Sequence, residues 1–213
     1  MIATPGPGER VVAGERLEEL IAAELIEARI VELGDRISRD YRGKQLHLVV
    51  VLKGAFVFAA DLVRRIKTPV RLDFIAASSY RGGIRPSAAV TLTGLERLDL
   101  VGRHVVVVDD ILDTGQTTAA ILAAVQRCGP ASACICALLR KPRARTGGPP
   151  LGYVGFEIGE DFVVGYGMDY GERYRGLCNI YRLLLNNAPR SKRPARGIDV
   201  FASLRCAFLR AYV

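Results

Sequence analysis

The sequence lacks any long apolar stretch, and no segment approaches the roughly 18–20 residues that a membrane-spanning helix needs. The N-terminal ten residues, MIATPGPGER, also lack the basic segment followed by an apolar segment that marks a secretory signal. Of the 213 residues, 50% are hydrophobic and 24% are charged, which is typical of a globular domain with a buried core. We therefore expect a cytoplasmic protein that does not contact membranes.

Residues for disulfide and zinc chemistry are scarce. The chain has five cysteines without a CxxC pair, and its only histidines are His47 and His104. A zinc cluster is therefore not expected. Cys134 and Cys136 alternate within SACICALL, so both side chains should lie on one face of a strand. With an odd cysteine number and a cytosolic location, we expect reduced, packed thiols.

The chain also lacks the GxxxxGK[ST] pattern of nucleoside triphosphate-binding loops. Its net charge is +8, and the segment from Asn186 onward carries +5 of this from six basic residues and one acidic residue. Such a tail can contact nucleic acid, but we expect a solvated extension and no nucleic-acid partner. The predicted organisation is a flexible Pro/Gly-rich segment (1–14), one domain (15–185) and a basic extension (186–213).

Apolar patterning predicts alternating strands and helices. Apolar runs predict strands at 46–52, 70–78, 104–108 and 132–140, and helical spacing predicts helices within 25–41, 55–66 and 115–127. Short late strands are expected in YVGFEI, FVVGYG and IYRLLL. This alternation predicts an α/β fold with a parallel twisted sheet flanked by helices on both faces.

In such sheets, ligands bind outside the carboxyl ends of the strands. The residues that follow the four main predicted strands should therefore surround one crevice. They are Lys53-Gly54, Ser79-Tyr80, Asp109 to Thr117, and Lys141.

The stretch VVVVDDILDTGQTT (105–118) holds most of the candidate chemistry. Its DTGQTT part supplies backbone N–H groups and hydroxyls at the start of a helix, which favours a phosphate. Asp109 and Asp110 would repel a phosphate but suit sugar hydroxyls and a divalent cation. Asp113 lies between the two groups, where it could transfer a proton. The alternative is that Asp113 or Thr114 only caps the helix.

These motifs resemble the type I phosphoribosyltransferases, and within them the hypoxanthine (guanine) phosphoribosyltransferases. The resemblance is carried in order by VVVLKGAFVFAADLVRRI, DFIAASSYRGG, VVVVDDILDTGQTT, LLRKP, VGFEI and EDFVVGYGMDYGERYRGL. It covers about residues 15–184. It implies the fold of that family, with a small hood subdomain formed by the N-terminal segment and about residues 150–185.

The resemblance also implies an activity, which is purine salvage. A 6-oxopurine attacks the anomeric carbon of phosphoribosyl diphosphate, giving IMP or GMP and releasing pyrophosphate, with Mg2+ as cofactor. The transition state is oxocarbenium-like, so a cationic sugar and an anionic leaving group must both be stabilised. A homodimer or homotetramer is implied as well.

Carried over by resemblance, the site residues fall into six groups. Asp113 is the general base near the purine N7. The residues that bind the phosphoribosyl group and its phosphate are Asp109, Asp110, Ile111, Leu112, Thr114, Gly115, Gln116 and Thr117. Pyrophosphate meets Lys53, Gly54 and Arg175, with a cis peptide expected at Lys53–Gly54. The purine meets Lys141, Phe162 and Val163. Asp169, with Asp109 and Asp110, serves the metal, and Ser79 and Tyr80 lie on a mobile loop that closes over the site.

Several alternatives stay open. Lys53 could be a solvated strand end, Phe162 a core residue, Asp169 a turn cap and Arg175 a surface charge, and the role given to Lys141 could belong to a neighbouring basic residue. Asp109 also departs from the family, which usually has Glu there, and RGGIRPSAA is less acidic and serine-rich than the family's mobile loop. Two other functions remain: a xanthine- or guanine-preferring enzyme, and a nucleotide- or RNA-binding regulator.

Overall fold

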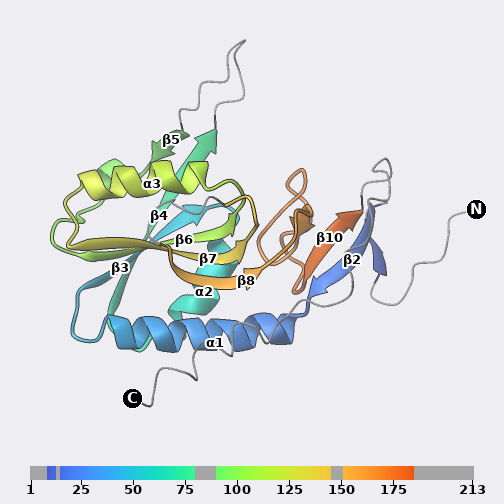
Figure 1. Ribbon diagram of the computed structural model, residues 1–213, viewed down its shortest axis with the longest axis horizontal. Coiled ribbons are helices and arrows are strands. Elements are labelled where there is room, and N and C mark those ends of the chain that lie inside the picture. The colour runs from blue at the N-terminus through green and yellow to red at the C-terminus, as the bar shows by residue number, and fades with distance from the viewer. Residues whose placement is uncertain (1–8, 13–14, 80–89, 145–150, 185–213) are drawn as a thin grey trace, which may run out of the picture.

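The computed structural model describes residues 9–12, 15–79, 90–144 and 151–184. A six-stranded sheet forms its centre, in the order β5-β4-β3-β6-β7-β8 (Figure 1). The strands are β3 (Leu46–Leu52), β4 (Val70–Ser79), β5 (Val90–Thr93), β6 (His104–Leu112), β7 (Ser132–Arg140) and β8 (Leu151–Glu157). The predicted strands thus form, and β6 runs four residues further than expected, into the acidic motif.

Four of the five strand pairs in this sheet are parallel, and only β4 with β5 is antiparallel. Leu46 on β3 lies beside Val70 on one neighbour and His104 on the other, so the three central strands start level with one another. Their carboxyl ends therefore reach the same edge of the sheet. The predicted α/β fold with a mostly parallel twisted sheet is confirmed.

Helices cover both faces of the sheet (Figure 1). α1 (Ala23–Asp40) and α2 (Phe56–Val63) pack on one face, and α3 (Gln116–Arg127) packs on the other. A short 3-10 helix, η1 (Leu95–Arg97), follows β5. The four-valine run of β6 alternates between the layers, with Val106 and Val108 toward α1 and α2, and Val105 and Val107 toward α3. A strand buried on both faces needs this unbroken apolar sequence.

A second, antiparallel sheet joins the two ends of the described chain. It contains β1 (Glu9–Val12), β2 (Glu15–Ile21), β10 (Ile180–Leu184) and β9 (Val163–Val164). Figure 1 shows it beyond the carboxyl end of the main sheet. Strand β8, which falls within the range expected for the hood, is instead an edge strand of the main sheet.

The cysteines of the described residues are all free. Cys136 is buried and Cys134 is partly buried, and both pack in the core between the sheet and α1, as their alternation predicted. Burial raises the pKa of the Cys136 thiol. Cys206 lies outside the described residues. Among the helices that the structure describes, none is long and apolar enough to cross a membrane.

Candidate active site

The loop from β6 into α3 begins the site. Helix α3 has Gly115 as its N-cap residue, with φ of 74° and no side-chain cap hydrogen bond. This left-handed conformation suits glycine because it has no Cβ. The alternative that Asp113 or Thr114 is the N-cap of this helix is therefore wrong. Asp113 and Thr114 are exposed ahead of the helix, and the Gln116 N–H reaches Thr114 Oγ1 only at 3.4 Å.

Asp109 and Asp110 end β6 with different surroundings. Asp109 is 6% exposed, and its carboxylate accepts hydrogen bonds from the Thr118 hydroxyl (3.2 Å) and the Asp110 N–H (3.1 Å). Burial, and then the Asp110 charge, raises the pKa of Asp109 well above its usual value. Burial also raises the pKa of Asp110. Both oxygens of Asp109 thus have partners within the protein.

Gly54, which follows β3, approaches Asp110 very closely. A Cβ added at Gly54 would lie 1.8 Å from Asp110 Oδ2, so only glycine leaves room for this carboxylate. The cis peptide bond in this loop is Leu52–Lys53. The expectation that it would be Lys53–Gly54 is wrong by one residue. The ends of β3 and β6 therefore meet, as the parallel topology predicted.

Lys141 follows β7 and faces the acidic loop. It is 7% exposed, and its Nζ lies 3.6 Å from Asp113 Oδ2. Its backbone N–H donates to the Leu112 carbonyl (2.9 Å), which fixes the end of β7 beside the end of β6. Its basic neighbours point elsewhere, because Arg140 pairs with Glu157 and Arg143 with Glu160. Among the described basic residues of this loop, Lys141 is thus the one that forms an ion pair with Asp113, and Arg145 lies outside the described residues.

The segment between β9 and β10 brings Arg175 and Asp169 together. Arg175 Nη2 lies 2.7 Å from Asp169 Oδ1, and Nη1 donates to the Gly167 carbonyl at 2.8 Å. Arg175 is therefore an anchored side chain rather than a free surface charge. Asp169 also accepts the Glu172 N–H (2.8 Å), so the turn-cap alternative holds for Asp169 alongside its ion pair.

This segment lies directly on the β3–α2 loop. A Cβ at Gly167, whose φ is 97°, would lie 2.3 Å from the Gly54 carbonyl oxygen. Across this contact, Glu172 reaches both Lys53 Nζ and Arg175 Nη2, each at 3.2 Å. The structure thus joins the two cations that were assigned to pyrophosphate.

Sequence reasoning missed Glu172 and Thr118. Glu172 stands in DYGERYRG among three other charged residues, which gave no indication of a partner over a hundred positions away. Thr118 directly follows the DTGQT run, and its burial beneath Asp109 depends on the orientation of α3.

The aromatic candidate Phe162 is 47% exposed, so the core alternative is wrong. Its ring packs edge-on against Tyr170, with centroids 5.7 Å apart. Val163 is buried in β9, where it pairs with Arg182. Such an exposed ring can accept a planar base on its face.

The remaining predicted residues have simple placements. Ile111 and Leu112 are the last residues of β6, Leu112 being buried, and Thr117 is exposed in the first turn of α3. Ser79 is the last residue of β4. Tyr80 and the rest of the predicted mobile loop lie outside the described residues.

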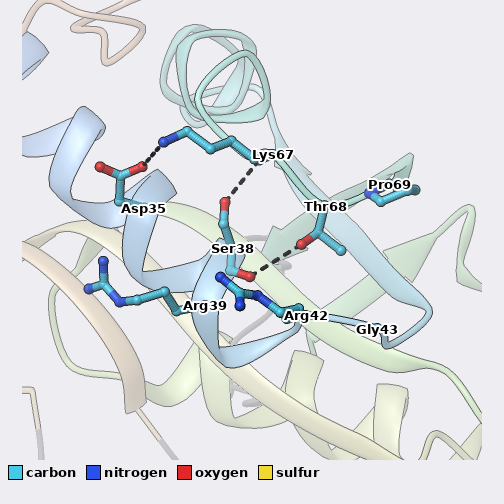
Figure 2. A pocket seen from close by; sticks show the side chains of 8 residues that line it. All are labelled: Asp35, Ser38, Arg39, Arg42, Gly43, Lys67, Thr68 and Pro69. Carbon is cyan, nitrogen blue, oxygen red and sulfur yellow. Dashed lines mark hydrogen bonds and ion pairs between the residues drawn. The ribbon is translucent and has the colours of Figure 1, made fainter.

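A hollow of about 470 Å³ lies at the opposite edge of the sheet, between the end of α1 and the turn before β4. Figure 2 shows that Lys67 closes it by pairing with Asp35 (2.7 Å) and by donating its N–H to Ser38 Oγ (2.9 Å). Because β3 and β4 begin here, this hollow is remote from Asp113 and Lys141 and belongs to a different surface.

The fold and these contacts define a phosphoribosyltransferase. The sequence model of the phosphoribosyl transferase domain matches residues 16–171. The chain is 44% identical over 184 residues to the hypoxanthine-guanine phosphoribosyltransferase of Mycobacterium tuberculosis, covering 83% of this chain and 91% of that protein. It is 43% identical over 172 residues to the hypoxanthine phosphoribosyltransferase of Haemophilus influenzae, covering 79% and 96%.

Solved structures agree. A hypoxanthine-guanine phosphoribosyltransferase from Bacillus anthracis superposes with a TM-score of 0.72 at 38% identity, covering 79% of this chain and 97% of that one. The hypoxanthine phosphoribosyltransferase of Trypanosoma cruzi gives 0.73 at 37%, covering 78% and 91%. The chain belongs to the hypoxanthine-guanine phosphoribosyltransferase family.

Proposed function

We propose that this protein transfers the 5-phosphoribosyl group of phosphoribosyl diphosphate to hypoxanthine, guanine or both, forming IMP or GMP and pyrophosphate in purine salvage. The observation that carries this proposal is the pairing of a buried lysine, Lys141, with Asp113 at 3.6 Å, at the carboxyl ends of two adjacent parallel strands. The pair combines a cationic donor and a carboxylate within reach of one small planar ligand.

At the purine end, Lys141 donates to the 6-oxo group and Asp113 accepts the proton from N7. The burial of Lys141 supports this role, because an ammonium group with little access to water gains from a further acceptor in the ligand beside Asp113. Adenine carries an amino group at that position, which cannot accept this hydrogen bond, so it is discriminated against. Phe162 stacks on the base, and the Val163 backbone meets its other edge.

At the sugar end, the segment from Thr114 to Thr117 holds the 5′ phosphate with hydroxyls and the first N–H groups of α3. The positive end of the helix and the left-handed Gly115 support this assignment. Asp110 binds the ribose hydroxyls. Asp109, whose oxygens accept from Thr118 and from the Asp110 N–H, supports Asp110 from beneath. Ile111 and Leu112, the last residues of β6, position the loop that follows.

At the diphosphate end, Lys53, Gly54 and Arg175 bind the leaving pyrophosphate, and Mg2+, when bound, would neutralise part of its charge. Within the described ranges, no three histidine, cysteine or acidic side chains form a ready-made metal cage. This fits magnesium, which keeps waters and takes substrate phosphate oxygens together with one or two carboxylates. Asp169, together with Asp109 and Asp110, would supply the carboxylates that hold the metal.

Preference among the bases is part of the same proposal. The named relatives favour hypoxanthine and guanine over a xanthine-preferring enzyme, and do not favour a regulator that binds RNA. A cytoplasmic location and a homodimer or homotetramer stay predictions.

A spectrophotometric assay with magnesium and phosphoribosyl diphosphate tests the proposal, with hypoxanthine, guanine, xanthine, adenine and uracil supplied separately. We expect turnover of hypoxanthine or guanine and none of adenine or uracil. Asp113→Asn should lower kcat by roughly 10²–10⁴-fold, the usual contribution of a general base. The folding of this variant should be unchanged, because Asp113 is half exposed.

Asp99→Asn is a matched control, because Asp99 is an exposed aspartate that pairs with Arg103. It should keep wild-type kcat. Turnover of adenine, or no turnover of any base by the wild-type protein, would contradict the proposal. A fully active Asp113→Asn variant would remove Asp113 from its proposed role.

A further inference from the structure

The carboxylate of Glu172 lies between two cations from separate parts of the chain. Lys53 comes from the loop after β3, and Arg175 from the turn before β10, and each has a nitrogen 3.2 Å from a Glu172 oxygen. Each cation contacts its own oxygen of the carboxylate, Lys53 at Oε1 and Arg175 at Oε2. The carboxylate therefore bridges the two charges as a bidentate anion does.

The backbone holds Glu172 in this position. Its φ is 62°, a left-handed conformation that is uncommon outside glycine, and its N–H donates to Asp169 Oδ2 at 2.8 Å. The turn is closed by backbone hydrogen bonds in both directions between Tyr170 and Arg173 (3.2 Å). The position of this carboxylate is thus set by the same turn that carries Asp169 and Arg175.

The bridge is accessible to solvent and to ligands. The side chains of Lys53 and Glu172 are 67% and 65% exposed, whereas that of Arg175 is 19% exposed and stays anchored by Asp169. Hydrogen bonds from Lys53 and then Arg175 hold the pKa of the Glu172 carboxyl below its usual value, so it is charged at neutral pH. Exposed ion pairs are weak and are readily exchanged for a stronger partner.

We propose that Glu172 is a positioning residue for the diphosphate, which holds Lys53 and Arg175 together as a stand-in anion until pyrophosphate displaces it. This inference rests on the proposed function, since it takes Lys53 and Arg175 as the pyrophosphate ligands. The diphosphate then replaces one carboxylate with several phosphate oxygens. When pyrophosphate leaves, Glu172 returns to the two cations and competes with rebinding.

The negative charge of Glu172 should affect both the binding of phosphoribosyl diphosphate and the release of pyrophosphate. A negative charge beside the site weakens the binding of every anion there, both substrate and product. It therefore assists release of pyrophosphate at the expense of affinity for phosphoribosyl diphosphate. The purine lies at the other end of the site, beside Lys141, and should not respond.

Glu172→Gln tests this inference, because glutamine keeps the size of the side chain and removes its charge. The dissociation constant of inorganic pyrophosphate with magnesium should be measured by isothermal titration calorimetry, and the KM values of phosphoribosyl diphosphate and hypoxanthine by steady-state kinetics. We expect the dissociation constant of pyrophosphate and the KM of phosphoribosyl diphosphate to fall roughly threefold to tenfold, as for the loss of two exposed ion pairs. The KM of hypoxanthine should stay within about twofold of the wild-type value.

Three comparisons sharpen the result. Glu172→Asp keeps the charge and should restore most of the wild-type affinity for pyrophosphate. Glu27→Gln removes an equally exposed carboxylate that pairs with Arg65 on the helical surface, and should change neither constant. The difference between wild type and Glu172→Gln should shrink in about 1 M salt, where charges are screened within roughly 3 Å.

Unchanged or weaker binding of pyrophosphate by Glu172→Gln would overturn the inference, as would an equal change in the KM of hypoxanthine, which indicates a general structural role. These outcomes are distinct from failure of the proposed function. In that case the wild-type protein itself would neither turn over a purine nor bind pyrophosphate.

Discussion

The close approach of Gly54 to Asp110 allows a demanding test of how the site is assembled. In Gly54→Ala, the new methyl group would lie 1.8 Å from Asp110 Oδ2 and 2.5 Å from its Cγ. Ordinary contacts of a Cβ begin near 3.4 Å, so the carboxylate must retreat by about 1.6 Å. The Gly54 carbonyl cannot move in the other direction freely, because Gly167 packs against it.

A displacement of about 1 Å in a substrate-positioning group can cost roughly 10²-fold in rate. We therefore expect kcat/KM for phosphoribosyl diphosphate to fall by at least about 10²-fold in Gly54→Ala. The midpoint of thermal unfolding should stay close to that of wild type, because the partly exposed Asp110 carboxylate can rotate away from the new methyl group. Steady-state kinetics and thermal unfolding, measured on the same preparation, separate these effects.

Gly176→Ala is the matched control, since a Cβ at Gly176 would meet nothing within 4 Å. It should keep wild-type kcat/KM. If kcat/KM for phosphoribosyl diphosphate in Gly54→Ala stays within about twofold of wild type, the Gly54–Asp110 contact has no functional role and the reasoning is refuted.

Two further predictions concern buried groups. Thr118→Val removes the hydroxyl that donates to Asp109 (3.2 Å), so the free energy of unfolding in urea should fall by about 1–3 kcal/mol, whereas Thr118→Ser should retain most of it. Burial lowers the pKa of His47 from 6.5, so the folded protein binds this proton less readily than the unfolded chain. The free energy of unfolding should therefore fall as pH drops below 6.5. His47→Gln, which keeps a hydrogen-bond partner for Asp73, should flatten this pH dependence when unfolding is measured between pH 7 and 5. An unchanged slope would exclude His47 as the source of the pH dependence.

Most of the fold could be predicted from the sequence. The strands at 46–52 and 132–140 coincide with β3 and β7, because a strand buried on both faces must be apolar throughout. The convergence of Gly54, Asp109 to Asp113 and Lys141 could also be predicted, because parallel strands have their carboxyl ends at one edge. Element ends were less certain, and β6 extends through the aspartates to Leu112.

Local details of the site were harder to predict. The cis peptide lies one bond earlier than expected, and Asp113 is not a cap because Gly115 takes that position. Neither feature follows from residue type alone, since each depends on the path of the loop between two packed elements.

The sequence by itself determined the layer architecture, the acidic motif at the end of a buried strand and the family to which the chain belongs. Periodicity and spacing are local properties, because they depend only on residues that are close together in the chain. Only the tertiary structure decided that Thr118 supports Asp109, that Gly54 makes room for Asp110 and that Glu172 bridges Lys53 and Arg175. These contacts join side chains whose distances are set by the packing of helix on sheet and of one sheet beside the other.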